Sequence, residues 1–252
     1  MANYQGMMTI VSKKELIKDV YEMILEGDAA SYISAPGQFI NIKINDSLQP
    51  YLRRPMSICD YDDHHIKMIF RVVGEGTRIL ANKNIGEHLD CLTGLGNGFT
   101  DLEKKSAVVI GGGLGVPPMY KLAKDLVTKG VKVTAILGFN SAKDVFYKEE
   151  FEAICPTFIA TMDGSMGEKG TVVDVLEKYQ FEMEAYYTCG PEKMLDALAL
   201  KYPDNGYLSF EARMGCGFGT CMGCSCKVKT KPYKRICVEG PILHSSEVIV
   251  NG

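Results

Sequence analysis

Apolar and polar residues alternate in short segments along the first part of the chain, up to residue 101. "MMTIV" at 7–11, "QFINIKI" at 38–44 and "IKMIFRVV" at 66–73 are of strand length and rich in β-branched residues, and the turn signals "APG", "YDDHH" and "GLGNG" lie near them. Short strands that reverse at tight turns are typical of antiparallel sheets. The pattern therefore predicts an antiparallel sheet or barrel over residues 1–101.

The pattern changes between residues 102 and 206. Buried runs, "SAVVIGGG" at 106–113, "VKVTAILGF" at 131–139 and "AYYTCG" at 185–190, alternate with amphipathic stretches such as "PPMYKLAKDLVTKG" and "TVVDVLEKY". Alternation of strands with helices favours a parallel sheet that has helices on its faces. We expect an α/β domain here, and a third, small unit at 207–252, where regular periodicity is weak.

The composition is that of an ordinary globular protein. The chain has 252 residues, of which 46% are hydrophobic and 23% charged, enough for one large or two modest domains. Its formal net charge of −3 gives no electrostatic reason to expect a nucleic acid or an anionic membrane as partner. No apolar run approaches the roughly 20 residues of a membrane helix. We expect no nucleic-acid partner, no membrane association and a cytoplasmic location.

The cysteines are distributed unevenly. The chain has 9 of them, and the C-terminal part holds Cys216, Cys221, Cys224, Cys226 and Cys237. A reducing compartment would keep such thiols free or bound to a metal. The others stand singly, and small buried side chains are their expected role; they are Cys59, Cys91, Cys155 and Cys189.

The segment "GCGFGTCMGCSCK" at 215–227 has metal-ligand spacing. C-x4-C-x2-C followed by a later cysteine is the plant-type [2Fe–2S] pattern, which predicts as ligands Cys216, Cys221, Cys224 and Cys237. The glycines between them permit a tight loop whose amides point at sulfur. Zinc is the main alternative, although zinc sites usually use paired C-x2-C units. Unligated or disulfide-bonded thiols are a further alternative. Cys226 is a surplus thiol, which we expect to pack beside the cluster site rather than to replace Cys224 as a ligand.

Two further motifs suggest phosphate binding. In "RRPMSICD" at 53–60, the planar guanidinium of Arg54 suits a diphosphate, because it can bond two oxygens at once. In "GEGTRIL" at 74–80, Gly76 permits a tight turn and Thr77 is expected as an N-cap, which would expose helix amides to phosphate. Short motifs of this kind also occur by chance, so a surface arginine before a strand is the alternative for Arg54.

A glycine-rich turn offers a second nucleotide site. "SAVVIGGGLGVPPMYKLAK" runs from a strand through a turn into a helix opened by Pro117 and Pro118, where phosphate can approach bare backbone. The glycines of this turn are Gly111, Gly112, Gly113 and Gly115. The strict G-x-G-x-x-G fingerprint fails because position 116 is valine, and no acidic residue ends the next strand. The ordinary dinucleotide fold is therefore a poor match.

These motifs together resemble the ferredoxin reductase superfamily. The R-x-x-S motif, "APGQFINIKI", "FRVVGEGTRIL" and "GEHLDCLTGLGNGF" are similar to its flavin barrel, and G-G-G-x-G-x-x-P with "CGP" at 189–191 to its nicotinamide domain. The resemblance assigns to FAD the residues Arg54, Pro55, Met56, Ser57, Arg71, Val72, Val73, Gly76 and Thr77. It assigns to NAD the residues Gly111, Gly112, Gly113, Gly115, Cys189, Gly190 and Pro191. For Cys189, a buried strand-end cysteine is the alternative.

A flavin barrel at 1–101, an NAD domain at 102–206 and a [2Fe–2S] domain at 207–252 are similar to the electron-transfer subunits of two-subunit, NAD-dependent dihydroorotate dehydrogenases. "RMGCGFGTCMGCSCKV" with "ICVEGPIL" is the most particular match. The small subunits of NADH-dependent ferredoxin:NADP oxidoreductases share the architecture but carry a "DGTGMCGxC" loop. The resemblance implies FAD, a [2Fe–2S] cluster and NAD, and an FMN-containing catalytic subunit in a heterotetramer of two of each chain. We find no catalytic base for dihydroorotate in this chain.

Two other functions stay open. One is an NADH-dependent flavin and iron–sulfur reductase that serves a ferredoxin-like acceptor, and the other is a zinc-stabilised interaction module. The expected preference for NAD over NADP rests on "GFNSAKDVFY" at 138–147, which has no arginine for a 2′-phosphate, although Lys143 could serve.

Overall fold

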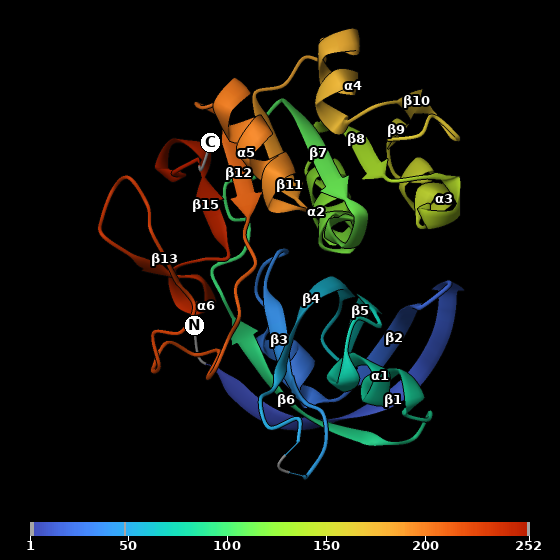
Figure 1. Cartoon of the computed structure of the whole chain (residues 1–252), viewed down its shortest axis with the longest axis vertical. Helices are drawn as coiled ribbons and strands as arrows, with labels where there is room; N and C mark the ends of the chain where they lie inside the picture. Colours follow the sequence, from blue (N-terminus) through green and yellow to red (C-terminus); the bar gives the residue numbers. More distant parts are fainter. Residues whose placement is uncertain (1–2, 48, 251–252) are drawn as a thin grey trace.

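The N-terminal part of the computed structural model, which describes residues 3–47 and 49–250, is a closed antiparallel barrel (Figure 1). Its strand order is β1-β2-β5-β4-β3-β6. The strands are β1 (Tyr4–Ile17), β2 (Val20–Glu26), β3 (Phe39–Lys43), β4 (Arg54–Tyr61), β5 (His65–Arg71) and β6 (His88–Leu95). The 3-10 helix η1 (Asp28–Tyr32) and helix α1 (Glu75–Asn82) lie in the connections. The predicted barrel is confirmed.

Alternation within the strands fills the interior of the barrel. On β3, Ile40 and Ile42 are 0% exposed and pack with Met8, Met23 and other inward-facing side chains. Successive strand residues point to opposite faces, so their neighbours Phe39 and Asn41 face outward. Each large apolar side chain buried in this way contributes about 1.5–3 kcal/mol. The alternating pattern of the sequence therefore becomes a core.

The second sheet has the order β10-β9-β8-β7-β11-β12-β15, parallel except for β15. Its strands are β7 (Ser106–Gly112), β8 (Lys132–Phe139), β9 (Thr157–Thr161), β10 (Glu168–Lys169), β11 (Ala185–Cys189), β12 (Gly206–Ser209) and β15 (Ile242–His244). Its helices are α2 (Val116–Thr128), α3 (Lys148–Glu152), α4 (Val172–Tyr179) and α5 (Glu192–Lys201), with η2 (Gly113–Gly115) and η3 (Ala142–Asp144). Helix α2 packs in one apolar cluster and α4 with α5 in another, so helices cover both faces, which confirms the predicted α/β class.

The C-terminal region leaves this sheet and returns to it. Between β12 and β15 it contains β13 (Ser225–Cys226), β14 (Lys234–Arg235) and α6 (Ile236–Glu239), and η4 (Ser245–Glu247) follows. Strand β12 spans the expected boundary at 206/207, and β15 pairs with it in antiparallel fashion. The parts 102–206 and 207–252 share one sheet and are therefore not separate folding units. The division into 1–101, 102–206 and 207–252 remains a proposal about which part binds which group.

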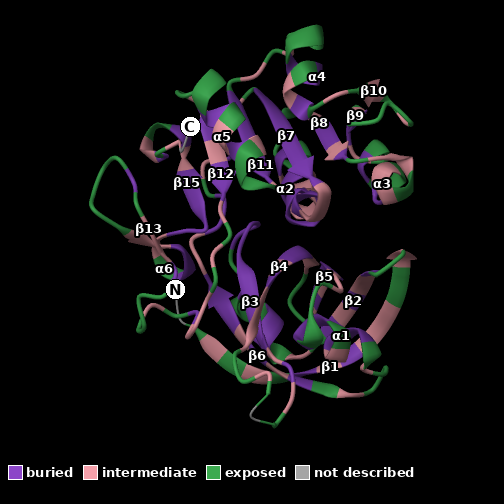
Figure 2. Cartoon of the chain, viewed as in Figure 1, coloured by how far each residue is buried: buried purple, intermediate pink, exposed green. Residues whose placement is uncertain are grey.

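Polar and aromatic contacts join the barrel to the second sheet. The Tyr147 hydroxyl donates a hydrogen bond to Glu22 of β2, and Lys124 of α2 lies 2.7 Å from the Asp60 carboxylate of β4. The central strands β7 and β11 are buried throughout, whereas most of β1 and of the C-terminal loops is half-buried or exposed (Figure 2). Within residues 3–47 and 49–250, no helix has the length and apolarity needed to cross a membrane.

Candidate functional site

A cavity of about 390 Å³ lies between the barrel and the C-terminal region. Seven residues that the sequence predicts for FAD line it: Arg54, Pro55, Met56, Ser57, Arg71, Val73 and Thr77. Phe39 of β3 and the segment from Ser209 to Met214 complete its wall. Strand ends from one domain and an irregular segment from another therefore form one concave site, a common arrangement for a cofactor.

Arg54 lies against the N-terminus of α1. A Cβ atom at Gly76 would lie 2.7 Å from Arg54 Nε and would displace the guanidinium from this position. Helix amides and a guanidinium both favour phosphate oxygens. The structure thus brings together the Arg54 guanidinium and the first amides of α1, which the sequence predicted separately as phosphate-binding groups. Their chemistry fits a diphosphate.

The predicted N-cap at Thr77 is wrong. Gly74, in extended conformation, caps α1, and Thr77 is its third residue. The Thr77 hydroxyl reaches back to accept hydrogen bonds from the backbone N–H groups of Val73 (3.0 Å) and Gly74 (3.1 Å). Thr77 therefore holds the turn in shape. Val72 packs against the barrel core and does not line the cavity, so its predicted contact with FAD remains only a prediction.

A second cavity, of about 450 Å³, lies at the carboxyl ends of β7 and β8. The predicted residues Gly112, Gly113 and Pro191 line it. Gly113 has a φ of +54° and open space where a side chain would be, so a phosphate can approach its backbone closely. Ligands of open parallel sheets bind at this end of the strands, and the cavity fits a dinucleotide.

The other glycines of the turn serve close packing. A Cβ at Gly115 would lie 2.1 Å from the carbonyl oxygen of Cys189, and one at Gly111 would lie 2.7 Å from Val116 Cα. These positions let the turn approach the "CGP" segment at 189–191. Gly190 lines a further cavity of about 640 Å³. Cys189 is 1% exposed and burial raises its pKa to about 12, so its predicted place beside a nicotinamide remains a prediction.

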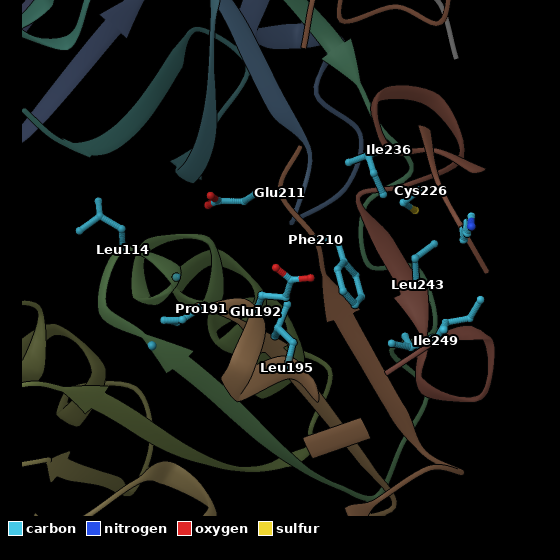
Figure 3. Close-up of a pocket in the computed structure, with 15 residues that line it drawn as sticks. Leu114, Pro191, Glu192, Leu195, Phe210, Glu211, Cys226, Ile236, Leu243 and Ile249 are labelled. Carbon is cyan, nitrogen blue, oxygen red and sulfur yellow. The ribbon is translucent and has the colours of Figure 1, made fainter. Parts of the chain in front are cut away.

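Three acidic residues that line these cavities were missed from the sequence: Asp144, Glu192 and Glu211. Asp144 of η3 lines the 450 Å³ cavity, and its carboxylate accepts a hydrogen bond from Ser141 Oγ at 2.7 Å. It lies five residues beyond the end of β8, where a ribose-binding acidic residue was expected. Glu211 lines the 390 Å³ and 640 Å³ cavities (Figure 3). It is exposed to solvent, and partial desolvation by the surrounding protein raises its pKa. No sequence signal marks Glu211, because only the crossing of the chain between the domains places it there.

The predicted cluster cysteines lie in two pairs. Cys216 and Cys221 exchange N–H···S contacts of 3.4 and 3.5 Å, and the N–H of Cys237 lies 3.4 Å from Cys224 Sγ. Burial alone would raise the pKa of Cys216, but hydrogen bonds from the backbone N–H groups of Cys221 and Phe218 lower it to about 6. The backbone therefore stabilises a thiolate, the form that binds metal, at Cys216, whereas burial and the neighbouring Cys224 raise the pKa of Cys237 to about 12.

The paired arrangement suits a binuclear cluster. In the described part of the chain, no three cysteine, histidine or carboxylate side chains gather around one position that could hold a metal ion. A tetrahedral zinc ion needs four donors at one point, whereas a [2Fe–2S] cluster takes two protein ligands on each of two irons. Cys226 instead lines the 640 Å³ cavity (Figure 3). The pairing of Cys216 with Cys221 and of Cys224 with Cys237 is consistent with the predicted set of ligands, which remains a prediction.

One short segment passes all three sites. Ser209, the last residue of β12, pairs with Cys189 of β11, next to the nucleotide site. The chain then forms part of the wall of the 390 Å³ cavity as far as Met214 and reaches the first cluster cysteine, Cys216. Groups bound at the three sites would therefore lie in sequence along one stretch of backbone.

Two family models match the chain. Residues 211–249 match the iron-sulfur cluster binding domain of dihydroorotate dehydrogenase B, and residues 109–199 match the oxidoreductase NAD-binding domain. Among solved structures, the NADH-dependent reduced ferredoxin-NADP oxidoreductase is similar with a TM-score of 0.88 and 27% identity, over 97% of this chain and 90% of that one. The ferredoxin reductase in carbazole 1,9a-dioxygenase, with a TM-score of 0.68 and 19% identity over 80% of this chain and 65% of that one, shares the fold.

Two curated relatives match over nearly their whole length. The "dihydroorotate dehydrogenase B (NAD(+)), electron transfer subunit" of Bacillus mycoides (strain KBAB4) is 43% identical, over 96% of this chain and 98% of that protein. The protein of the same name from Geobacillus sp. (strain WCH70) is 44% identical, over 98% of this chain and 99% of that protein. The resemblance drawn from the motifs is confirmed. This chain belongs to the family of electron transfer subunits of NAD-dependent dihydroorotate dehydrogenase B.

Proposed function

We propose that this chain is the electron transfer subunit of a dihydroorotate dehydrogenase in de novo pyrimidine (UMP) synthesis. It would pass electrons from the FMN of a catalytic partner through a [2Fe–2S] cluster and FAD to NAD⁺. When bound, a flavin exchanges electrons singly or in pairs. It can therefore exchange single electrons with a cluster and a hydride with a nicotinamide. The observation that carries the proposal is the segment from Ser209 to Cys216, along which the three sites follow one another.

The chain's own residues hold and orient these groups. Arg54 and the first amides of α1 would bind the FAD diphosphate, and Ser57 and Phe39 would border the ring. Leu114, Val73 and Arg71 line both the 390 Å³ and the 450 Å³ cavity, so the flavin and nicotinamide rings would meet at this shared wall.

Asp144 supports the choice of NAD over NADP. Its carboxylate faces the nucleotide cavity, where it can accept hydrogen bonds from ribose hydroxyls and would repel a 2′-phosphate. Lys143, the one cation that the sequence offered for a 2′-phosphate, is not among the residues that line this cavity.

Oxidation of dihydroorotate would take place on a catalytic partner, because we identify no base for that reaction in this chain and the relatives are named as electron transfer subunits. We propose that the partner docks over the cluster loop, in a heterotetramer of two of each chain. Apolar side chains are exposed around this loop: Phe218 (46%), Met222 (54%) and Val238 (41%). We also propose a cytoplasmic location, since a reducing compartment would protect the cluster thiolates.

One observation favours a second candidate function. The 0.88 TM-score with the NADH-dependent reduced ferredoxin-NADP oxidoreductase structure is consistent with a reductase that delivers electrons to a ferredoxin-like acceptor. The two functions differ in the protein that exchanges electrons with the cluster.

Purification of the native complex under anaerobic conditions tests the proposal. We expect an FMN-containing partner to copurify, and FAD and iron to be present in this chain. The complex should reduce NAD⁺ with dihydroorotate, and the isolated chain should not. Copurification with a ferredoxin-like protein, without FMN or dihydroorotate oxidation, would instead support the second function.

A further inference from the structure

Strand β3 carries a fully buried polar side chain that contacts the cluster loop. Asn41 is 0% exposed, and its Nδ2 donates a hydrogen bond of 3.3 Å to the carbonyl oxygen of Cys216. The two residues are 175 positions apart in the chain. The contact therefore ties the flavin barrel to the first of the predicted cluster ligands.

The loop is pressed closely against this side chain. Gly217 has a φ of +80°, and a Cβ there would lie 2.4 Å from Asn41 Nδ2. A larger residue at 217 would suffer both backbone strain and a clash. Asn41 and Gly217 thus fit together, and each limits what the other position can hold.

The amide is retained at an energetic cost. Asn41 Oδ1 is buried and accepts no hydrogen bond from any residue that the structure describes. Such an unpaired acceptor costs about 1–3 kcal/mol, whereas leucine at this position would avoid the cost. A buried amide kept at this cost needs a role that only a hydrogen-bonding group can fill.

The backbone around Asn41 is firmly held. Asn41 pairs with Pro55 of β4 and with Leu92 of β6. The guanidinium of Arg53 donates to the Asp90 carbonyl at 2.7 Å and forms an ion pair of 2.7 Å with the Asp90 carboxylate beside it. A side chain on such a rigid strand can fix the position of a flexible loop.

The same strand forms part of the flavin cavity. Phe39 lines that cavity and shares the outward face of β3 with Asn41, because alternate strand residues point the same way. One face of β3 thus presents Phe39 to the flavin site and Asn41 to the cluster loop.

We propose that Asn41 is a positioning residue of the cluster: it fixes the Cys216–Gly217 peptide to the flavin barrel and so sets the environment of the first ligand. The proposal rests on the proposed function, in which these cysteines hold a [2Fe–2S] cluster. Cluster potentials depend on hydrogen bonding and solvent exposure around the ligands, and partners that orient ligands affect metal retention. The barrel would thereby tune a group bound by a distant part of the chain.

Asn41→Leu, which keeps the size of the side chain and removes its hydrogen bond, tests the proposal in the native complex. We expect altered EPR g values of the reduced cluster, a shifted midpoint potential and release of iron to a chelator about ten- to a hundredfold faster, with FAD content unchanged. Wild-type values of all three cluster properties would overturn the proposal.

Asn97→Ala is the matched control. Asn97 also ties the barrel side to the C-terminal region, through hydrogen bonds of 2.9 and 3.0 Å with the backbone of Ile242, but it does not contact the cluster loop. We expect lower thermal stability with the wild-type EPR signal and potential. If the cluster changed equally in both variants, the effect would be a general loosening and the specific role of Asn41 would be overturned.

A second variant, Asn41→Ala, decides the matter even if Asn41→Leu does not fold, because it removes the same hydrogen bond with a smaller side chain. It should speed iron release and shift the midpoint potential in the same direction as Asn41→Leu. A wild-type release rate and a wild-type potential in Asn41→Ala would overturn the proposal. Native complex without iron would overturn the proposed function and this inference together, whereas an iron-containing complex indifferent to these changes would overturn the inference alone.

Discussion

The flavin barrel and the C-terminal cluster region position their groups by different means. The barrel closes a ladder of six strands and buries its own core, and the binding residues are carried on its strands and on α1. In the cluster region, β13 and β14 have two residues each, and the four predicted ligands lie in turns or in the short helix α6. We infer that the barrel keeps its shape without a ligand, whereas the fold of the cluster loop depends on the metal.

The strongest test of this difference is Cys221→Ser. Cys221 accepts N–H contacts from Cys216 and Gly223, and its loss removes one of four ligands. We expect complete loss of iron and of the visible absorption of the cluster, with about one FAD retained per chain. Metal analysis and flavin quantification measure the two separately.

Cys226→Ser is the control for that variant, because Cys226 lies two residues from a predicted ligand but faces another cavity. We expect it to retain about two irons per chain. Iron retained in Cys221→Ser, or stoichiometric zinc in anaerobically prepared native protein, would contradict the ligand assignment.

Arg54→Ala is the reciprocal test at the barrel. Loss of a charge-assisted hydrogen-bonding group should weaken FAD binding by about 1.5–3 kcal/mol, roughly ten- to a hundredfold or slightly more. Iron content should not change, because the two sites come from opposite ends of the chain. Titration of the FAD-free protein with FAD measures the affinity.

Arg78→Ala is the matched control on α1, the helix against which Arg54 of β4 lies, since Arg78 is exposed and lines neither the flavin nor the nucleotide cavity. It should bind FAD as the wild type does. Equal losses in the two variants would indicate a general effect of charge and would place the diphosphate elsewhere.

A smaller effect is expected at Asp144, where a short 3-10 helix beyond a strand end supplies the side chain. In Asp144→Ala, the preference for NADH over NADPH should fall about tenfold. NADH would lose one hydrogen bond from its ribose, and the 2′-phosphate of NADPH would no longer be repelled. The ratio of kcat/KM values with ferricyanide as acceptor measures it. An unchanged ratio would show that other residues select the nucleotide.

The smallest effect is expected at Glu211, in the segment between the two regions. Glu211 is exposed to solvent, but partial desolvation by the surrounding protein raises its pKa in the folded state. The ionised carboxylate therefore destabilises the fold slightly above that pKa, and the cost disappears where the group is protonated in both states. Glu211→Gln should therefore raise the Tm at pH 8 and have no effect at pH 4. A higher Tm at pH 4 alone would contradict this assignment.

Local patterns predicted the regular parts of the molecule and the ligand types. Period-two alternation identified β3 and β5, and cysteine spacing gave a ligand set that the paired thiols support. Glu211 and Asn41 were not found, since each reaches its site through contacts between segments distant in sequence. Asp144 was missed because it lies on a short 3-10 helix beyond the strand end at which an acidic residue was expected. Thr77 was misassigned because Gly74 fills the capping position without a side chain.

The antiparallel pairing of β12 with β15 has a consequence for repair of the protein after oxidative damage. The cluster region is an excursion between two paired strands, since Ser209 and Ile242 lie opposite each other. Both ends of this segment stay paired if the cluster is destroyed, so Cys237 remains close to the other thiols. The chain therefore loses little further conformational entropy when the four cysteines come together again. Reassembly can then proceed locally, on a chain whose flavin and nucleotide sites are still folded.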